Sequence, residues 1–309
     1  MRIVSLLPSA TEMICEIGLS EHLVGVSHEC DYPTRVTSLP KVTQSRIPPN
    51  ATSAEIDTIV TKQSQQGDLS LYTLDEPLLQ TLCPDVIVTQ TLCSVCAVSE
   101  SEIHAISEKF STPPLLINLS PTSLSEVIAG HLTLGRALGH EAKALEAVKR
   151  LQQRVDVVTR RSLAIRPNPS VVLLEWLDPP FSAGHWNPQL IRMAGGVEAI
   201  GEENAKSRRI DWSQLMNADP EVLLVACCGY GVERSVQDVA KLVEIDGFKS
   251  LQAYREHRIY IADGSSYFNR PGPRLVDSLE LLAHAIDPKV HAMPSNLIPM
   301  VRWDHTFER

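Results

Sequence analysis

The sequence lacks the features of several common classes of protein. No apolar stretch among its 309 residues approaches the roughly 20 residues that a helix needs to cross a bilayer. The formal net charge is -9, and Arg160-Arg161 and Arg208-Arg209 are isolated pairs of cations rather than a cluster. Because nucleic-acid backbones are bound through clustered Lys and Arg, the sequence predicts neither a nucleic-acid partner nor insertion into a membrane.

The familiar motifs of catalysis and nucleotide binding are also missing. The sequence contains neither the G-x-S-x-G elbow of a serine hydrolase nor the H-E-x-x-H of a zinc protease. Its 15 glycines form neither G-x-G-x-x-G nor G-x-x-x-x-G-K-[ST], the loops that cradle phosphates. These absences favour a binding protein over an enzyme.

Cysteine is sparse and odd in number, with seven residues in the chain. That is not the density of a small secreted domain held together by disulfides, so we expect reduced thiols. The amino-terminal run from Met1 ends at Pro8 and lacks the hydrophobic region and cleavage site of a signal peptide. On the chain as given the expected location is cytoplasmic, and it would be periplasmic if a leader had been removed.

Short aliphatic runs alternate with helical patterns along most of the chain. The runs are too continuously apolar for half-exposed antiparallel strands, which predicts parallel sheets covered by helices on both faces. They fall into two groups, so the predicted fold class is α/β with two lobes. The predicted strands are Ile3–Leu6, Leu23–Val26, Val86–Val88, Leu115–Ile117, Val171–Leu174, Val222–Val225 and Ile259–Ile261.

The region between the two groups is rich in Leu, Ala, Glu, Lys and Arg and has no strand pattern. It predicts a helix that Gly139 ends, followed by a long helix over Glu141–Arg161. At 1.5 Å per residue that helix is about 30 Å long, enough to bridge two lobes. The predicted domains are an N-terminal lobe over residues 1–122, a helical connector over 123–163, a C-terminal lobe over 164–287 and a tail over 288–309.

Aromatic residues are few, with five Phe, four Trp and six Tyr, but they gather in the loops that follow predicted strands. In open parallel sheets ligands bind outside the carboxyl ends of the strands, and aromatic rings around a cleft suit a large, flat, partly apolar ligand. We therefore predict a ligand cleft between the lobes. The candidate ligand-binding residues are Cys30, Tyr32, Cys93, His185, Trp186, Cys228, Tyr230, Tyr267, Asn269 and Arg270.

Two other interpretations stay open at these loops. Cys93 and Cys96 have the spacing of a metal knuckle or a redox pair, and Cys30 or Cys227-Cys228 could join them to hold a metal ion. The chain would then be a cytosolic metal-binding or thiol-redox protein. The last interpretation is an enzyme of tetrapyrrole handling, in which a loop histidine or cysteine acts on a side chain of the ligand.

Several segments resemble a known family, the cobalamin-binding and iron-siderophore-binding proteins that serve ABC importers. The first segment, Ile3–Glu12, reads IVSLLPSATE and is typical of the whole superfamily. Three others resemble a subgroup of putative cobalamin-binding proteins. They read TQTLCSVCAV over Thr89–Val98, FSAGHWNP over Phe181–Pro188 and YFNRPGPR over Tyr267–Arg274.

The resemblance spans about residues 2 to 286 and implies more than the residues alone predict. It implies two lobes joined by one long helix, cobalamin or another corrinoid as the ligand, and an ABC permease as a partner. Aromatic contacts would come from Tyr32, Trp186 and Tyr230, and polar contacts from Asn269 and Arg270. The sequence departs from the importer pattern in its missing leader and in its cysteine-rich loops.

Overall fold

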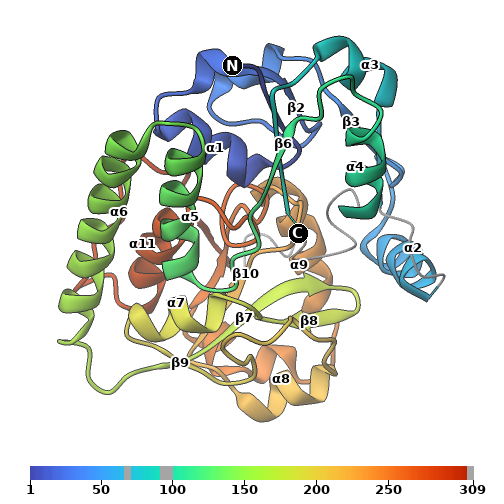
Figure 1. Cartoon of the computed structure of the whole chain (residues 1–309). Helices are drawn as coiled ribbons and strands as arrows, with labels where there is room; N and C mark the ends of the chain where they lie inside the picture. Colours follow the sequence, from blue (N-terminus) through green and yellow to red (C-terminus); the bar gives the residue numbers. More distant parts are fainter. Residues whose placement is uncertain (66–70, 91–99, 305–309) are drawn as a thin grey trace. The chain divides into compact units, whose positions relative to one another are not determined.

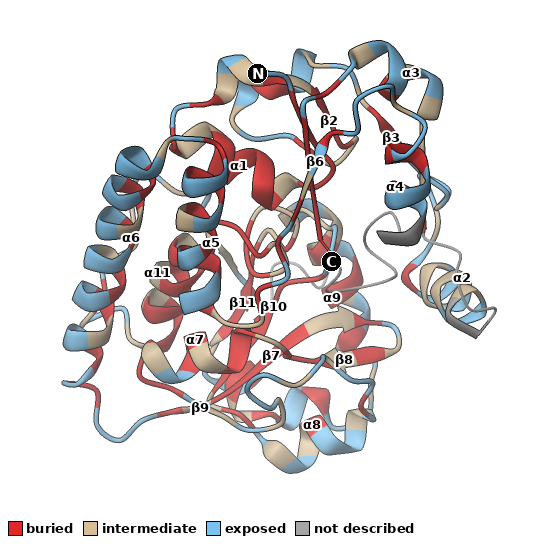
Figure 2. Ribbon diagram, viewed as in Figure 1, coloured by how far each residue is buried: buried red, intermediate tan, exposed pale blue. Residues whose placement is uncertain are grey.

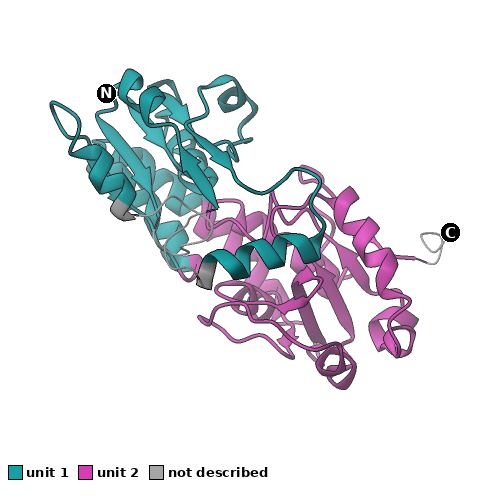
Figure 3. Cartoon of the chain, turned by 90° about the vertical axis from the view of Figure 1, so that its right-hand side faces the viewer, with its two compact units in different colours: residues 1–121, 125–150 teal, residues 122–124, 151–309 magenta. Residues whose placement is uncertain are grey.

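The predicted aliphatic runs form strands of two separate sheets in a computed structural model that describes residues 1–65, 71–90 and 100–304 (Figure 1). The chain divides into two compact units (Figure 3). Unit 1 comprises residues 1–121 and 125–150, and unit 2 comprises residues 122–124 and 151–309. Each unit holds one of the sheets with its flanking helices, so the predicted α/β class is confirmed.

The main sheet of unit 1 has the strand order β2-β1-β5-β6 and is parallel throughout. Its central strands β1 and β5 are buried along their whole length, which explains their unbroken apolar sequence. The edge strand β6 is partly exposed, with Leu115 at its start half exposed. The strands are β1 (Ile3–Ser5), β2 (Leu23–Val26), β5 (Val86–Thr89) and β6 (Leu115–Asn118).

Unit 1 also contains a small antiparallel pair that the sequence did not predict. Strand β3 (Thr43–Ser45) pairs with β4 (Tyr72–Leu74). Each strand has three residues, too few for an alternating pattern to be recognised. The helices that belong to unit 1 alone are α1 (Pro8–Glu16), α2 (Ser53–Gln65), α3 (Glu76–Leu82) and α4 (Glu100–Ser107), with 3-10 turns η1 (Ser20–His22) and η2 (Thr34–Ser38).

The sheet of unit 2 has the strand order β12-β11-β10-β7-β8, and β9 pairs with the start of β7. Strands β7, β10 and β11 are parallel, whereas β8 and β12 join antiparallel at the two ends. Figure 2 shows β10 and β11 as buried strands. The strands are β7 (Ser170–Leu177), β8 (Pro180–Ser182), β9 (Val197–Glu198), β10 (Val222–Val225), β11 (Ile259–Ile261) and β12 (Val301–Arg302).

The helices of unit 2 pack around this sheet on an apolar core that includes Leu215, Val239, Leu242 and Phe248. The last of them begins at Leu275, two residues after Pro273. The helices are α7 (Asn187–Met193), α8 (Trp212–Ala218), α9 (Val232–Leu242), α10 (Gln252–Arg255) and α11 (Leu275–Ile286), with a 3-10 turn η3 (Phe248–Ser250).

Both units contain a proline and an acid directly before a strand, Pro84-Asp85 before β5 and Pro220-Glu221 before β10, and the same turn precedes each. In unit 1, Asp75 accepts a hydrogen bond from the Leu78 backbone N–H (3.0 Å) at the start of α3, and Cys83 ends the helix with φ +41°. In unit 2, Asp211 takes part in a capping box at the start of α8, and Asp219 ends that helix with φ +36°. The next strand begins three residues after each of these left-handed residues, so both units turn from helix to strand in the same way.

The two long helices that lie between β6 and β7 in the sequence form where their composition predicted them. Helix α5 (Leu124–Ala137) and helix α6 (Glu141–Ser162, 22 residues) run side by side (Figure 1). A Cβ atom on Gly135 would lie 2.4 Å from that of Ala144, so glycine allows this close approach. The division between the units falls inside α6, after Arg150. Within the described residues, no helix is both long and apolar enough to cross a membrane.

The C-terminal segment after Asp287 contains more regular structure than its sequence predicts. Strand β12 pairs with β11, and the Trp303 backbone N–H donates to the Ile259 carbonyl (2.8 Å). Trp303 is buried, whereas Ile298 is half exposed. Two paired residues are too short a strand for the sequence pattern to show.

The Glu16 carboxylate joins three helices of unit 1 through a buried histidine and an arginine. His131 on α5 is fully buried, and its Nε2 lies 3.1 Å from the Glu16 carboxylate at the end of α1. Its Nδ1 lies 3.1 Å from the Ile128 carbonyl. Arg150 on α6 also contacts Glu16, at 3.2 Å. The hydrogen bonds and charges of His131 and Arg150 hold the pKa of Glu16 below its usual value, although burial opposes this.

We expect Glu16→Gln to lower the free energy of unfolding at pH 7 by about 1–2 kcal/mol, because His131 loses its charged partner. A carboxyl with a lowered folded pKa stabilises the fold above its unfolded pKa, and this contribution is lost as the pH falls through the folded pKa. The difference from wild type should therefore shrink below pH 4. Urea denaturation across this range measures it. Glu146→Gln, which removes an exposed ion pair with Lys143, is the matched control and should change stability by less than about 0.5 kcal/mol.

Candidate ligand-binding site

Most of the predicted ligand-binding loops follow the carboxyl ends of the parallel strands, whereas the loop with His185 and Trp186 follows β8, which runs antiparallel to β7. In unit 1, β1, β2 and β5 run in the same direction, so the segments after Ser5, Val26 and Thr89 lie at one edge of the sheet. In unit 2, the same holds for the segments after β7, β10 and β11. These edges are where a ligand of an open parallel sheet is expected to bind.

The loop after β2 in unit 1 is held by a network of hydroxyl groups. Thr43 Oγ1 accepts a hydrogen bond from the His28 backbone N–H (3.0 Å) and lies 2.7 Å from His28 Nδ1. It also donates to Ser27 Oγ (3.2 Å). With Ser27 and Thr43 both buried, the network fixes the direction in which the loop leaves the strand.

Cys30 and Tyr32 have opposite environments within this loop. Cys30 is buried, with its Sγ 3.1 Å from Thr11 Oγ1, and its carbonyl accepts a hydrogen bond from Lys41 Nζ (2.8 Å). The ring of Tyr32 is 51% exposed, which leaves a large apolar face open to solvent. Cys30 therefore shapes the loop, and Tyr32 is the side chain that it presents.

The predicted metal knuckle lies outside the described residues, because Cys93 and Cys96 fall in segment 91–99. Thr89 and Gln90, which lead into that segment from β5, are buried. Across residues 1–65, 71–90 and 100–304, no group of three His, Cys, Asp or Glu side chains is placed to hold a metal ion. The cysteines of this part, including Cys227 and Cys228, form no disulfide with one another.

A carboxylate at the end of β7 holds the first loop of unit 2. Glu175 accepts hydrogen bonds from the Gly184 backbone N–H (2.9 Å) and from Asn187 Nδ2 (2.8 Å). A Cβ atom on Gly184 would lie 2.1 Å from the Ser207 backbone nitrogen, so only glycine allows the two segments to meet here. Burial raises the pKa of Glu175 despite its hydrogen bonds, which include one from Ser207.

His185 and Trp186 lie next to each other at the tip of this loop, with ring centroids 5.4 Å apart. His185 is half-buried and has φ +53°, and its backbone N–H donates to the Ala205 carbonyl. Burial and the nearby Lys206 lower the pKa of His185, so its imidazole is neutral at pH 7. Trp186 is buried, and its Nε1 donates to the Phe268 carbonyl (2.6 Å). Trp186 thus joins the first loop of unit 2 to the third.

In the second loop of unit 2, Tyr230 packs against Trp176 of β7, and both rings are partly buried. The rings of Trp176 and Tyr230 lie 4.8 Å apart, and the Arg234 guanidinium lies 5.1 Å from the Tyr230 ring centroid. Cys228 is exposed beside them, whereas its neighbour Cys227 is buried. Burial raises the pKa of the Cys227 thiol, so Cys227 is not a thiolate at neutral pH.

The third loop of unit 2 turns its predicted residues mostly toward the protein. Tyr267 is buried, and its hydroxyl accepts a hydrogen bond from the Ile298 backbone N–H (3.2 Å). Asn269 Nδ2 donates to the carbonyls of Ala226 (2.8 Å) and Gly264 (3.1 Å), which ties this loop to the end of β10. Arg270 is half-buried and donates to Ser265 Oγ (3.1 Å).

Sequence reasoning missed the acids that hold these loops. Glu175 lies within a run that reads VVLLEW, and an acid inside a continuously apolar strand was the available signal. Glu198 ends β9 and accepts hydrogen bonds from the backbone N–H groups of Ile200 (3.0 Å) and Gly201 (2.9 Å). No comparable signal marked Glu198, because a strand of two residues has no pattern.

The two sheets, with their loops gathered at the carboxyl edges, define a ligand-binding protein built from two α/β units. Residues 3–265 match the family described as periplasmic binding protein, and the chain belongs to this family.

Among individual proteins, the chain is 26% identical to the uncharacterized ABC transporter substrate-binding lipoprotein YvrC of Bacillus subtilis, over 93% of this chain and 80% of YvrC. It is 22% identical to a vitamin B12-binding protein of Vibrio cholerae, over 90% of this chain and 86% of the relative.

Solved structures share the fold. The apo form of the periplasmic heme-binding protein RhuT from Roseiflexus sp. RS-1 aligns with a TM-score of 0.70 at 24% identity, covering 94% of this chain and 99% of RhuT. The vitamin B12-binding protein BtuF of Vibrio cholerae aligns with a TM-score of 0.63 at 19% identity, covering 92% and 96% of the two chains.

The Glu198 carboxyl should make the stability of the protein depend on pH near neutrality. Burial raises its pKa to about 7, above the value of about 4.3 expected in the unfolded chain. Between these values the folded state binds more protons, so the free energy of unfolding falls as the pH rises from about 4 to 8. Glu198→Gln should remove a part of this fall on the order of 3 kcal/mol.

Urea denaturation of both proteins at several pH values measures this effect. Glu202→Gln is the matched control, since Glu202 is an exposed acid on the same loop and its loss should leave the pH profile unchanged. A Glu198→Gln profile parallel to that of wild type would contradict the assignment.

Proposed function

We propose that this protein binds a corrinoid, or a related large macrocycle, in a cleft between its two units and delivers it to an ABC permease without chemically changing it. The ligand would contact the loops at the carboxyl edges of both sheets. The family supports a binding role, because it is described by binding rather than by a reaction.

The observation that carries this proposal is the presence of aromatic rings at the carboxyl edge of each sheet, with the ring of unit 1 exposed and those of unit 2 partly buried. Unit 1 presents Tyr32, and unit 2 presents Tyr230 with Trp176 beside it. Large rings offer wide contact at small cost in side-chain entropy, which suits a flat ligand with a partly apolar face. Small hydrophilic ligands would gain little from such surfaces.

The polar residues of the same loops would orient the ligand. The neutral imidazole of His185 can donate one hydrogen bond and accept another, and Arg270 can donate to amide, carboxylate or phosphate oxygens. Cys228 is exposed near the aromatic pair. Trp186, Tyr267 and Asn269 would act indirectly: they would hold these loops in position without contacting the ligand.

The relatives support both the ligand class and a location outside the cytoplasm. One is named for vitamin B12 and another for heme, and both of these ligands are large macrocycles. The family description is periplasmic, and YvrC is described as a lipoprotein. We therefore favour the periplasmic alternative over the cytoplasmic location that the sequence predicted.

Titration of the purified protein with cobinamide, cyanocobalamin and hemin tests the ligand class. We expect at least one of them to change its visible spectrum and to raise the melting temperature of the protein, because a ligand that binds only the folded state stabilises it. If none produces either change at tens of micromolar, the macrocycle proposal is wrong.

Variants at Tyr32, which is exposed, and at Tyr230, which is partly buried, test whether one ligand contacts both units. Tyr32→Ala and Tyr230→Ala should each weaken binding of the same macrocycle by about tenfold, since each loses one aromatic contact. The matched controls are Leu115→Ala and Val197→Ala. These residues are about as exposed as Tyr32 but lie at the amino ends of β6 and β9. Loss of affinity in only one of the two tyrosine variants would contradict a shared site.

A further inference from the structure

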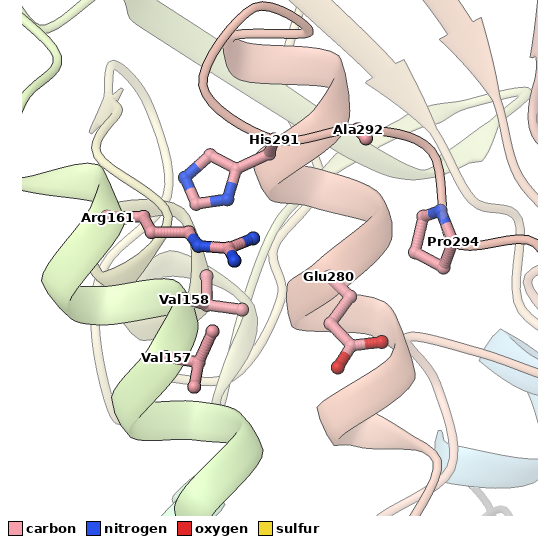
Figure 4. A pocket seen from close by; sticks show the side chains of 7 residues that line it. All are labelled: Val157, Val158, Arg161, Glu280, His291, Ala292 and Pro294. Carbon is pink, nitrogen blue, oxygen red and sulfur yellow. The ribbon is translucent and has the colours of Figure 1, made fainter.

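A pocket lies in unit 2 and is lined by none of the predicted ligand-binding residues. It forms where the last turns of α6 face α11 and the segment that follows α11 (Figure 4). Its volume is about 140 Å³, enough for several waters or a small organic molecule. The residues that line it are Val157, Val158, Arg161, Glu280, His291, Ala292 and Pro294.

The acids near this pocket already have a cationic partner. Arg154 Nε donates to one Glu280 oxygen (2.9 Å), and its Nη2 donates to the other (2.8 Å) and to Asp277 (2.5 Å). One guanidinium therefore forms ion pairs with both carboxylates. The desolvation of these groups is offset by the charge-assisted bonds, which raise the pKa of Arg154 above its ordinary value.

Arg161 is a second cation at this pocket, and it takes no part in the ion pairs of Arg154 with Glu280 and Asp277. It follows Arg154 by seven residues and so lies on the same face of α6. Within the part of the chain that the structure describes, its guanidinium has no hydrogen bond or ion pair. In Figure 4 it reaches from α6 toward α11 and lies beside the His291 ring.

His291 supplies a second polar group on the opposite wall. It is 5% exposed, its Nε2 lies 3.1 Å from Ser162 Oγ, and its carbonyl lies 2.9 Å from His284 Nδ1. These contacts fix the ring. Burial and the charges of Arg161 and His284 lower the pKa of His291, while Asp287 opposes them, so a neutral imidazole lies next to the Arg161 guanidinium at this pocket.

From this geometry we infer that the pocket binds a small monocarboxylate with a short aliphatic body, its carboxylate on Arg161 and His291 and its alkyl part against Val157, Val158 and Pro294. The planar guanidinium fork matches a carboxylate in a bidentate pair. An inorganic phosphate would place more negative charge near Glu280 and would leave the apolar walls unused. The inference does not depend on the proposed function of the strand-end loops.

Titration of the full chain with sodium butyrate at pH 7 and constant ionic strength tests this inference. We expect saturable shifts of the His291 ring resonances in NMR spectra, with a Kd on the order of 1 mM. Butyramide has the same shape but no charge and should bind at least about tenfold more weakly, as should sodium phosphate.

Variants on α6 separate the pocket from nonspecific binding. Arg161→Gln should lose at least about tenfold in butyrate affinity, and Arg161→Lys should retain part of it, because the charge remains without the fork. Arg160→Gln is the matched control, since Arg160 is adjacent but bonds the Asp156 carbonyl and does not line the pocket. Butyrate binding that is absent, equalled by butyramide, or unchanged in Arg161→Gln would overturn the inference.

Discussion

A parallel strand of three or four residues can satisfy its backbone hydrogen bonds only inside a covered sheet, and this constraint organises both units. Strands β1, β5, β10 and β11 are buried from end to end, so their side chains are committed to the core. Polar and aromatic side chains that could meet a ligand must then lie beyond the strand ends. The position of Tyr32 and Tyr230 at the carboxyl edges follows from this division of roles.

The two units hold their strand-end loops by different chemistry. Unit 1 uses the hydroxyl groups of Ser27 and Thr43, which stay neutral over the physiological pH range. The loops of unit 2 are held by the carboxyl groups of Glu175 and Glu198, and burial raises the pKa of both. A fall in pH toward 6 therefore protonates Glu198 and removes the negative charge that accepts the hydrogen bonds of the loop after β9.

Most of the fold could be predicted because short, continuous stretches of sequence determine its central strands and long helices. Aliphatic runs marked the central strands, and composition with Gly139 marked α5 and α6 to within two residues at each end. The short pairs β3-β4, β9 and β12 could not be predicted, because two or three residues carry no period and their pairing depends on distant segments. The same limit hid Glu198, whose environment is created by a loop and not by its neighbours in sequence.

The site was predicted less completely than the fold, because sequence position shows which residues reach a loop but not which way they turn. Cys30, Trp186, Tyr267 and Asn269 all lie in the predicted loops, yet each makes its hydrogen bonds within its own unit. An aromatic residue in such a loop can bind a ligand or stabilise the loop, because burial of its ring stabilises the loop that carries it. Only exposure separates Tyr32 from Tyr267, and exposure is a tertiary property.

These buried residues still matter for binding, because they order the loops before a ligand arrives. Trp186 joins the loop after β8 to the loop after β11 through the Phe268 carbonyl, and Asn269 joins the latter to the end of β10. A loop fixed in this way loses little conformational entropy when it meets a ligand, so more of the contact energy of the exposed rings remains as affinity. The buried aromatic residues of unit 2 therefore reduce the conformational entropy that the loops lose on binding, while the more exposed rings supply the contacts with the ligand.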